Sequence, residues 1–226
     1  MERSIYGDEI GLVQYIDHMG DDRRAAASAR ASFAKDIETR TLEEDEKLIH
    51  FLLRHGHNSP FEHSTISIRF TVPLFVRSQL IRHRTFSYNE MSRRYTSAGL
   101  EFWAPRELRA QAAKNLQCSS DETISDPDLL ARFTEHNRVS RNLYLDLVQS
   151  GVSRELARSV LPVSSYTTFW MTGNLRNWLT VFHIRLKPDV QPETLEAMRA
   201  AFEIVEQLFP LTIRVLQESG FLPVRE

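Results

Sequence analysis

The 226-residue sequence predicts an α+β protein with an antiparallel sheet packed against long helices. Residues 64–72 alternate between apolar and polar side chains, as expected for a strand with one buried face. Residues 128–149 and 192–209 carry apolar side chains at helical spacing over several turns. The predicted strands are short and are separated by helices, and the length is that of one compact domain. We therefore expect a single domain over residues 1–226.

The composition is that of a soluble globular protein, with 42 % hydrophobic and 26 % charged residues. No run approaches the roughly 20 apolar residues of a membrane span, and residues 1–3 lead into no signal-peptide core. We expect a cytoplasmic protein without a membrane partner. The single cysteine, Cys118, lies in a polar stretch without a neighbouring histidine, so it forms no intrachain disulfide and lacks an activating base.

The first part of the chain predicts one strand and two helices. Residues 9–19 have the composition of a strand and end at a glycine–aspartate break. Asp21 and Asp22 then cap an alanine-rich helix over residues 23–33. Thr41 begins a stronger helix, which has acids in its first turn and Gly56 just beyond its end.

Residues 55–63 combine histidines with signals for a helix start. Four of the eight histidines lie between His50 and His63, but no ligand spacing such as His-Glu-x-x-His is present, which disfavours a metal site. Ser59 and Glu62 form an S-x-x-E capping box, with a proline at the first helical position. The free N–H groups of such a helix start bind phosphate groups. A cap without any ligand is the alternative.

The next elements are a strand, a helix and an irregular stretch. After the strand at 64–72, Pro73 starts a helix over residues 74–83, which presents Gln79, Arg82 and His83 on one face. The helix should break after Arg84, because residues 85–89 prefer a strand or a loop. Residues 95–103 are predicted to form a strand, and residues 106–127 a polar surface excursion with helical content.

The second half of the chain is mainly helical. After the helix at 128–149, Ser153 caps a short helix with Arg154 and Arg158 on one face. β-branched and aromatic residues predict a strand at 164–172. A helix follows over residues 175–185. Asn174 and Arg185 are eleven residues apart, about three turns, which places both on one face. Two further helices, at 192–209 and 211–219, are expected to serve packing.

The stretch from Arg77 to Arg94 is the strongest functional signal. It holds five arginines and one histidine against one acid, Glu90, so its formal charge is +4 while that of the whole chain is −2. Neutral hydrogen-bonding residues and three aromatic rings are interleaved with these charges: Ser87, Asn89, Ser92, Phe86, Tyr88 and Tyr95. Guanidinium groups bind phosphate, short polar side chains bind base edges, and rings stack on bases. A nucleotide site is therefore predicted, with a solvated basic face as the alternative.

The spacing within this stretch resembles the signature of the flavin-dependent thymidylate synthases. The match is Arg82-His83-Arg84 followed after seven residues by Ser92, and it continues through Ser87, Asn89, Glu90, Arg94 and Tyr95. The resemblance extends from about residue 55 to residue 185. It implies an α+β fold and a homotetramer with sites at subunit junctions. It also implies conversion of dUMP to dTMP, with methylenetetrahydrofolate as carbon donor and non-covalently bound FAD, reduced by NADPH, as hydride donor.

The resemblance also implies site residues. Those matched to dUMP binding are Gln79, Leu80, Ile81, Arg82, Glu90, Met91, Ser92, Arg93, Arg94, Arg158 and Arg185. Those matched to FAD binding are His57, Ser59, Arg82, His83, Arg84, Glu90, Asn174, Arg176 and Thr180, although many relatives carry asparagine in place of Thr180. No metal is implied. Arg185 is the candidate catalytic residue, because a cation that stabilises the N3 anion of uracil activates C5 without a thiolate.

Two other classes of function remain open from the sequence. The basic stretch could be a phosphate track of a nucleic-acid-binding module, although the net charge of −2 and the lack of a second basic patch oppose this. The histidine-rich segment could belong to a metalloenzyme. Ser92 is expected to bind substrate rather than act as a nucleophile, since its neighbours are cations that would suppress the basicity of a histidine.

Overall fold

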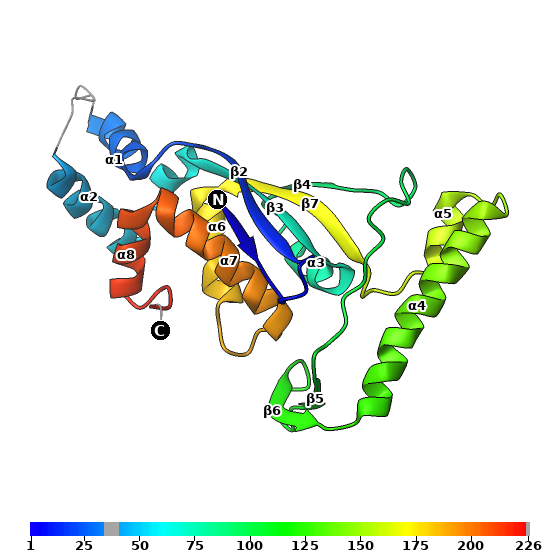
Figure 1. The fold of residues 1–226 in the computed structure, drawn as a ribbon. Coiled ribbons are helices and arrows are strands. Elements are labelled where there is room, and N and C mark those ends of the chain that lie inside the picture. The colour runs from blue at the N-terminus through cyan, green and yellow to red at the C-terminus, as the bar shows by residue number, and fades with distance from the viewer. Residues whose placement is uncertain (34–40, 225–226) are drawn as a thin grey trace.

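The computed structural model describes residues 1–33 and 41–224 and is built around an antiparallel five-stranded sheet (Figure 1). The predicted fold class is therefore confirmed. The strands follow the spatial order β1-β2-β3-β7-β4, and every neighbouring pair is antiparallel. Their bounds are β1 (Glu2–Ser4), β2 (Leu12–Met19), β3 (Thr65–Pro73), β4 (Ser87–Glu90) and β7 (Tyr166–Asn174).

The pair β3 and β7 forms the centre of the sheet. It is in continuous register from Thr65 opposite Asn174 to Pro73 opposite Tyr166. The apolar set of β3 that alternation predicts is fully buried on one face: Ile66, Ile68, Phe70 and Val72. The other face carries hydroxyl pairs across the two strands, Ser67 with Thr172 at 2.9 Å and Thr71 with Thr168 at 3.0 Å. A one-residue slip would exchange these two faces, so the alternation itself determines the register.

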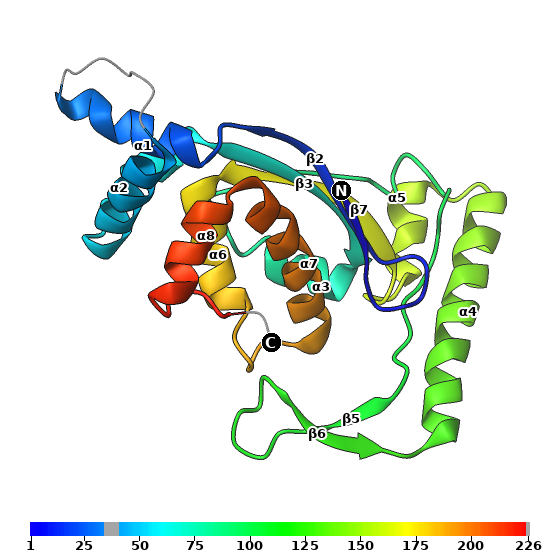
Figure 2. The same cartoon turned by 60° about the vertical axis from the view of Figure 1, so that its left-hand side comes forward.

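Three helices cover the apolar face of the sheet: α3 (Leu74–Leu80), α6 (Leu175–Arg185) and α7 (Pro192–Leu208) (Figure 2). A fourth helix, α8 (Pro210–Glu218), packs against α7 and the N-terminal helices. Trp178 of α6 is fully buried, and its indole N–H donates to the backbone oxygen of Ile66 at 3.2 Å. Phe182 of the same helix meets Phe202 of α7 edge to face, with ring centroids 5.2 Å apart. The predicted helix at 175–185 is thus confirmed, and the pair of helices after residue 192 is confirmed as packing elements.

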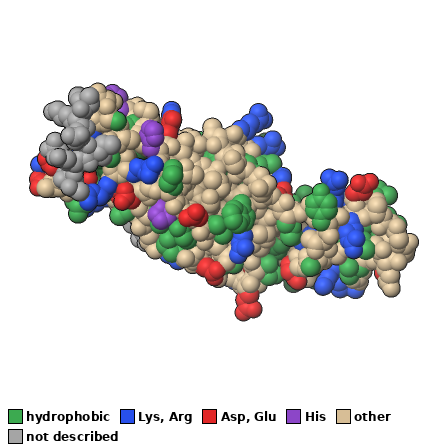
Figure 3. Space-filling model, turned by 90° about the horizontal axis from the view of Figure 1, so that it is seen from above, with side chains coloured by type: hydrophobic (Ala, Val, Ile, Leu, Met, Phe, Trp, Pro, Cys, Tyr) green, Lys and Arg blue, Asp and Glu red, His purple; other side chains and the backbone are tan. Residues whose placement is uncertain are grey.

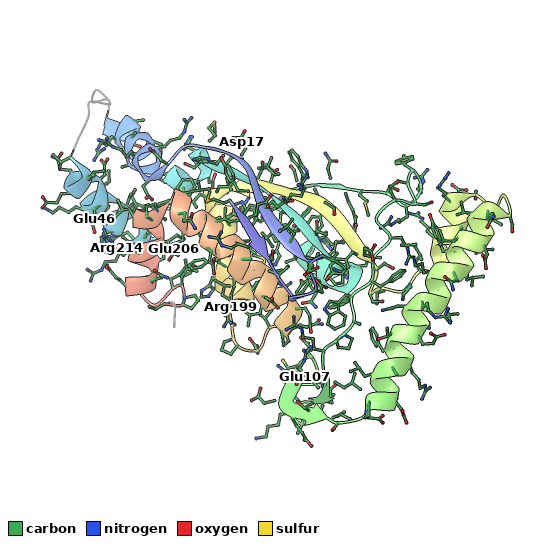
Figure 4. All side chains as sticks on the ribbon, viewed as in Figure 1. Asp17, Glu46, Glu107, Arg199, Glu206 and Arg214 are labelled. Carbon is green, nitrogen blue, oxygen red and sulfur yellow. The ribbon has the colours of Figure 1, made fainter. Side chains whose placement is uncertain are left out.

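Two N-terminal helices, α1 (Asp22–Arg30) and α2 (Leu42–Arg54), lie at one end of the sheet (Figure 1). The side chain of Asp21 accepts from the backbone N–H of Arg24 at 3.0 Å, and a short 3-10 turn, η1 (Ala31–Phe33), follows α1. Thr41 and Glu44 cap α2 reciprocally. Glu46 of α2 pairs with Arg214 of α8 at 2.5 Å, and Figure 4 shows the two side chains next to each other.

A separate arm stands at the opposite end of the molecule (Figures 1 and 2). It consists of the hairpin β5 (Leu108–Gln111) with β6 (Ser119–Ile124), the long helix α4 (Pro127–Gln149), α5 (Arg154–Ala157) and the 3-10 turn η3 (Arg158–Val160). A second small core of Leu100, Tyr144 and Ala157 holds the arm together. Seen from above, the molecule is elongated, with a narrower waist before the arm (Figure 3).

The arm corrects two predictions. Residues 106–127 form the hairpin β5–β6 rather than a segment with helical content, and Arg109 of this hairpin pairs with Glu193 of α7 at 2.6 Å. Residues 95–103 form no strand; one isolated bridge joins Phe102 to Ser165. Gly99 takes a left-handed φ of +58° there, which interrupts an extended conformation. Long-range contacts outweigh local propensity in both segments.

The start and end of several elements also differ from prediction. The first long strand begins at Leu12 rather than residue 9, because Tyr6, Gly7 and Glu9 have positive φ angles that form a turn after the unpredicted β1. Helix α3 ends at Leu80 instead of residue 83. The hydroxyl of Tyr88 donates to the backbone oxygens of Leu80 and His83, at 2.9 Å each, and so occupies carbonyls that a longer helix would use.

The capping box predicted at Ser59 is wrong. The segment is a short 3-10 turn, η2 (Ser59–His63), with Asn58 at its N-cap and no side-chain cap hydrogen bond. Glu62 forms an ion pair with Arg176 of α6, so its carboxylate does not reach back to the start of the turn. Ser153 likewise stands at the N-cap of α5 without a side-chain hydrogen bond. Among the described helices, none is long and apolar enough to cross a membrane.

We predict that Asp22→Ala destabilises the fold by about 2 kcal/mol, because it removes hydrogen bonds to a buried carboxylate. The sequence predicts that Asp22 caps its own helix. Its carboxylate instead accepts hydrogen bonds from two backbone N–H groups at the start of α8, those of Leu211 at 2.8 Å and Thr212 at 2.9 Å. Urea unfolding measures the effect. Asp128→Ala, an exposed aspartate in the first turn of α4, is the control, and an equal loss in both variants would contradict the prediction.

Candidate active site

The signature residues lie around the turn that joins α3 to β4. Arg82, His83 and Arg84 occupy this turn, and Ser92 follows β4 by two residues. Gln79, Arg82 and His83 therefore do not share a helix face; the turn makes hydrogen bonds from the N–H of Arg82 to the oxygen of Gln79 and from the N–H of His83 to the oxygen of Leu80. Arg82 and Arg84 are exposed, whereas His83 is half-buried.

Arg185 at the end of α6 reaches this turn. Its Nε–H donates to Nε2 of His83 at 2.9 Å, and Nη2 donates to the backbone oxygen of Gln79 at 3.0 Å. Burial, together with the charge of Arg185, lowers the pKa of His83 to about 4, so the imidazole is neutral at pH 7 and can accept this hydrogen bond. Burial also lowers the pKa of the Arg185 guanidinium. The guanidinium is thus fixed in direction, while its other donors are left for a ligand.

A cavity of about 430 Å³ opens between α3, β4, β7 and the η3 turn. Five residues predicted to bind dUMP line it: Glu90, Met91, Ser92, Arg93 and Arg158. Glu90 forms an ion pair with Arg77 and accepts a hydrogen bond from the hydroxyl of Thr167 at 2.8 Å. In the described part of the chain, the hydroxyl of Ser92 makes one hydrogen bond, accepting from the N–H of Arg94 at 3.2 Å. The cavity therefore combines cations, a carboxylate and a free hydroxyl proton.

The arginines around this cavity differ in their availability. Arg93 donates to the backbone oxygens of Ala98 and Gly99, at 2.5 and 2.7 Å, and burial lowers its pKa, so it holds a loop in place. Arg94 is exposed and lies 5.8 Å above the ring of Tyr95. Arg158 is exposed, with a single weak contact of 3.4 Å to the backbone of its own turn. Neither Arg158, which lines the cavity, nor Arg94 beside it in the chain segment after Ser92 forms an ion pair among residues 1–33 and 41–224, so both can bind an anion.

Two other residues matched to dUMP lie differently. Leu80 is fully buried in the core, so only its backbone can contact a ligand, and its oxygen already accepts from Tyr88. Ile81 is half-buried beside it at the C-cap of α3. Gln79 donates to the side chain of Gln191 at 2.5 Å.

Residues predicted to bind the flavin lie partly around a larger cavity of about 850 Å³ between α2, α6 and α8. Arg176 and Thr180, both exposed on α6, line it. Apolar residues such as Phe61 and Leu179 and the cation Arg54 complete its lining. A cavity of this size, with apolar walls and a few cations, matches the usual sites of large cofactors.

The other residues matched to the flavin are distributed around the same end of the sheet. His57 and Ser59 are exposed at the turn after α2, next to the cavity-lining residue Asn58. Asn174 caps α6, because its side-chain oxygen accepts from the N–H of Asn177 at 2.9 Å. Asn174 and Arg185 are eleven residues apart and stand at opposite ends of α6, about three turns from each other.

The site residues thus form separate groups on one chain. The cavity containing Glu90 and Ser92 is not lined by Gln79, Arg82 or Arg185. The tertiary structure brings Arg185 to His83, which the sequence matched to different ligands. Sequence reasoning also missed Arg77 and Thr167, the two partners of Glu90. The charge of Arg77 was visible in the basic stretch, but its partner was not.

Neither a metal centre nor an activated thiol is assembled from the candidate residues. Within residues 1–33 and 41–224, no three histidine, cysteine, aspartate or glutamate side chains lie close enough to hold a metal ion. Two of the four histidines at 50–63, His55 and His57, instead pack with Phe51 in an aromatic cluster. The ring centroids of Phe51 and His55 are 4.2 Å apart. The thiol of Cys118 donates to the backbone oxygen of Asp189 at 3.0 Å.

Comparisons relate the chain to known proteins. Residues 14–211 match the family model described as thymidylate synthase complementing protein. A flavin-dependent thymidylate synthase of Thermus thermophilus is 38 % identical over 208 residues, which cover 92 % of this chain and 76 % of the relative. One from Thermosipho africanus is 36 % identical over 216 residues, covering 93 % and 92 % of the two chains. The crystal structure of the UMP/dUMP methylase PolB from Streptomyces cacaoi, bound with 5-Br dUMP, has a TM-score of 0.82 at 29 % identity and covers 94 % of this chain and 97 % of that chain.

We predict that His83 stays neutral from pH 8 to pH 5 and titrates near pH 4, as followed by the NMR signals of its ring. Because its pKa in the folded state is below the ordinary value of 6.5, the stability it contributes is present above pH 6.5 and lost as the pH falls toward 4. Arg185→Ala should raise this pKa but leave it below 6.5, since burial is the larger cause. Titration of His83 at its ordinary pKa would contradict the buried contact with Arg185.

Proposed function

Because this chain belongs to the flavin-dependent thymidylate synthase family, we propose that it converts dUMP to dTMP with methylenetetrahydrofolate as the carbon donor and NADPH as the reductant. It is an enzyme, a methyltransferase acting on the pyrimidine of dUMP. The nucleic-acid-binding alternative is set aside, since neither the relatives nor the similar structure is of that class. A cytoplasmic location stays a prediction.

The observation that carries this proposal is the fixed guanidinium of Arg185. Two of its donors are held by neutral His83 and by the backbone of Gln79, which directs the remaining donors without side-chain motion. A preoriented cation stabilises developing negative charge more than a mobile one, because no reorganisation is needed during reaction. We assign Arg185 to the uracil ring, where it would stabilise the N3 anion and so make C5 nucleophilic.

No nucleophilic side chain is required for this route. The hydroxyl oxygen of Ser92 accepts from the backbone N–H of Arg94, and within residues 1–33 and 41–224 no basic side chain accepts the proton of this hydroxyl. Serine activation needs such a base. Cys118 contacts a backbone oxygen far along the chain from the signature. We therefore assign Ser92 to binding of dUMP, together with Arg94 and Arg158, whose exposed cations suit the phosphate.

The donor set fits a flavin dinucleotide bound without a covalent link. Arg176 and Thr180 line the cavity of about 850 Å³, which offers apolar walls for a ring system and cations for a diphosphate. Arg82 and Arg84 are exposed on the turn after α3, where they can bind phosphate oxygens. When bound, the flavin supplies the hydride that completes the methyl group. We propose these residues, with His57, Ser59 and Asn174, as its binding set.

We further propose that the enzyme works as a homotetramer. Glu90 and Ser92 share one cavity, whereas Arg82 and Arg185 do not line it, so a second copy could complete each dUMP site. Large apolar side chains are exposed on the arm and on the outer face of the sheet. Five of them are each 41–50 % exposed: Leu129, Val139, Leu143, Leu145 and Trp170. Exposed apolar surfaces of this kind mark interaction sites.

The test is direct. The purified protein should show the visible absorbance of a flavin and, with dUMP, methylenetetrahydrofolate and NADPH, should form dTMP. Supplying UMP in place of dUMP measures which nucleotide is preferred, since the similar structure is of a UMP/dUMP methylase. Cys118→Ala should keep near-normal activity, because the thiol lacks a base. A colourless protein, or loss of all activity in a folded Cys118→Ala variant, would contradict the proposal.

We predict that Ser92→Ala and Arg185→Ala damage different kinetic constants. Ser92→Ala should raise the KM for dUMP about tenfold and leave turnover measurable at saturation, because it removes a binding contact. Arg185→Ala should lower kcat about a hundredfold, because it removes charge stabilisation at the reacting ring. Steady-state kinetics measure both. An inactive Ser92→Ala variant with normal dUMP affinity, or a covalent adduct between Ser92 and uracil seen by mass spectrometry, would sink these assignments.

A further inference from the structure

Arg77 joins the candidate dUMP site without belonging to the signature. It projects from α3 and forms an ion pair with Glu90 at the end of β4, and Thr167 of β7 donates to the other carboxylate oxygen of Glu90 at 2.8 Å. Three separate elements therefore converge on one carboxylate. The side chains of Arg77 and Glu90 are 29 % and 23 % exposed, and all three residues line the cavity of about 430 Å³.

The carboxylate of Glu90 lies in a cavity that is proposed to bind a negatively charged nucleotide, so its presence there needs an explanation. The proposed ligand carries a phosphate, and like charges in a partly desolvated site repel each other. Glu90 therefore cannot lie against the phosphate. A carboxylate near N3 of the uracil would oppose the anion that Arg185 is assigned to stabilise. The hydrogen-bond donor of dUMP that remains for Glu90 is the hydroxyl of the deoxyribose.

The carboxylate has capacity for such a contact. An ionised carboxyl group accepts about four hydrogen bonds, and two positions on Glu90 are occupied by Arg77 and Thr167. The Nε–H of Arg77 is itself buried and finds no partner among the described residues. Leaving a donor unsatisfied costs free energy, so the placement of Arg77 carries a cost within the folded chain.

We propose that Arg77 is a positioning residue of the nucleotide site, which holds Glu90 so that its carboxylate accepts a hydrogen bond from the deoxyribose hydroxyl of dUMP. This inference rests on the proposed function. Arg77 neutralises the charge of Glu90 in the presence of the phosphate and fixes one of its oxygens, while Thr167 fixes the other. The pair thereby selects nucleotides by their sugar hydroxyl, separately from the uracil chemistry.

The experiment compares dUMP with its analogue lacking the 3′-hydroxyl, by equilibrium binding to the flavin-loaded protein. The unaltered protein should bind the analogue about tenfold more weakly, because a hydrogen bond to a charged group is lost. Arg77→Ala and Glu90→Gln should each bind dUMP more weakly and lose most of this discrimination. The double variant should be no worse than either single variant, since the two residues act as one unit.

Matched variants separate positioning from damage to the fold. Ser78→Ala, the exposed neighbour of Arg77 on α3, should keep full discrimination. Arg77→Lys should keep part of the discrimination, because lysine retains the positive charge but lacks the planar guanidinium group. If Arg77→Ala does not fold, Thr167→Val provides the same test, since it removes only the donor to Glu90. Turnover at saturating dUMP should fall much less than affinity.

Two outcomes would overturn the inference in different ways. Unchanged discrimination in folded Arg77→Ala, alongside normal dUMP binding by the unaltered protein, would reject the role of Arg77 and leave the proposed function intact. Failure of the unaltered protein to bind dUMP while it retains flavin would reject the proposed function, and this inference with it.

Discussion

The pairing of β3 with β7 is the constraint on which the site depends. Strand β3 leads directly into α3 and the signature turn, β7 leads directly into α6, and β4 pairs with β7 on its other edge. The register that sets Thr65 opposite Asn174 therefore also sets the relative positions of Arg77, Glu90 and Arg185. A one-residue slip would expose the apolar face of the sheet and move each of these groups. Core packing and site geometry are thus specified by the same alternation of side chains.

Concentrating cations in one region of a protein is costly because they repel one another, and the chain holds the arginines of the proposed nucleotide site in different ways. Arg77 is paired with Glu90, Arg93 with backbone oxygens of a loop, and Arg185 with a neutral imidazole and a backbone oxygen. Neutral acceptors fix a guanidinium without cancelling its charge, whereas a carboxylate does both. Arg185, the arginine assigned to charge stabilisation, is held by neutral groups, so no carboxylate among these contacts offsets its charge.

The arm shows where local propensity gives way to tertiary contacts. Residues 106–127 have helical composition in part, yet they form a hairpin because Arg109 bonds Glu193 of α7 and Ser119 of the facing strand. The helix α4 packs only a small second core and leaves several large apolar side chains exposed. Within its own chain, α4 is held by the amide of Asn137, which donates to the backbone oxygen of Trp103 and accepts from the hydroxyl of Ser164.

The sequence alone determined the fold class, the central strand and the family signature, because the period-2 alternation in β3 and the spacing of residues 82–95 are local properties. It also placed the helix α6 at residues 175–185, as the structure has it, although the cap at Asn174 was not predicted. Only the tertiary structure decided that Asp22 caps α8, that His83 is the neutral partner of Arg185, and that Arg77 holds Glu90. The partners of Asp22 and Arg185 lie 190 and 102 residues away, and even Arg77 and Glu90 meet through a turn whose direction is set by Tyr88. The sequence gives the type of each side chain, whereas its partner depends on which helices and strands pack together in the tertiary structure.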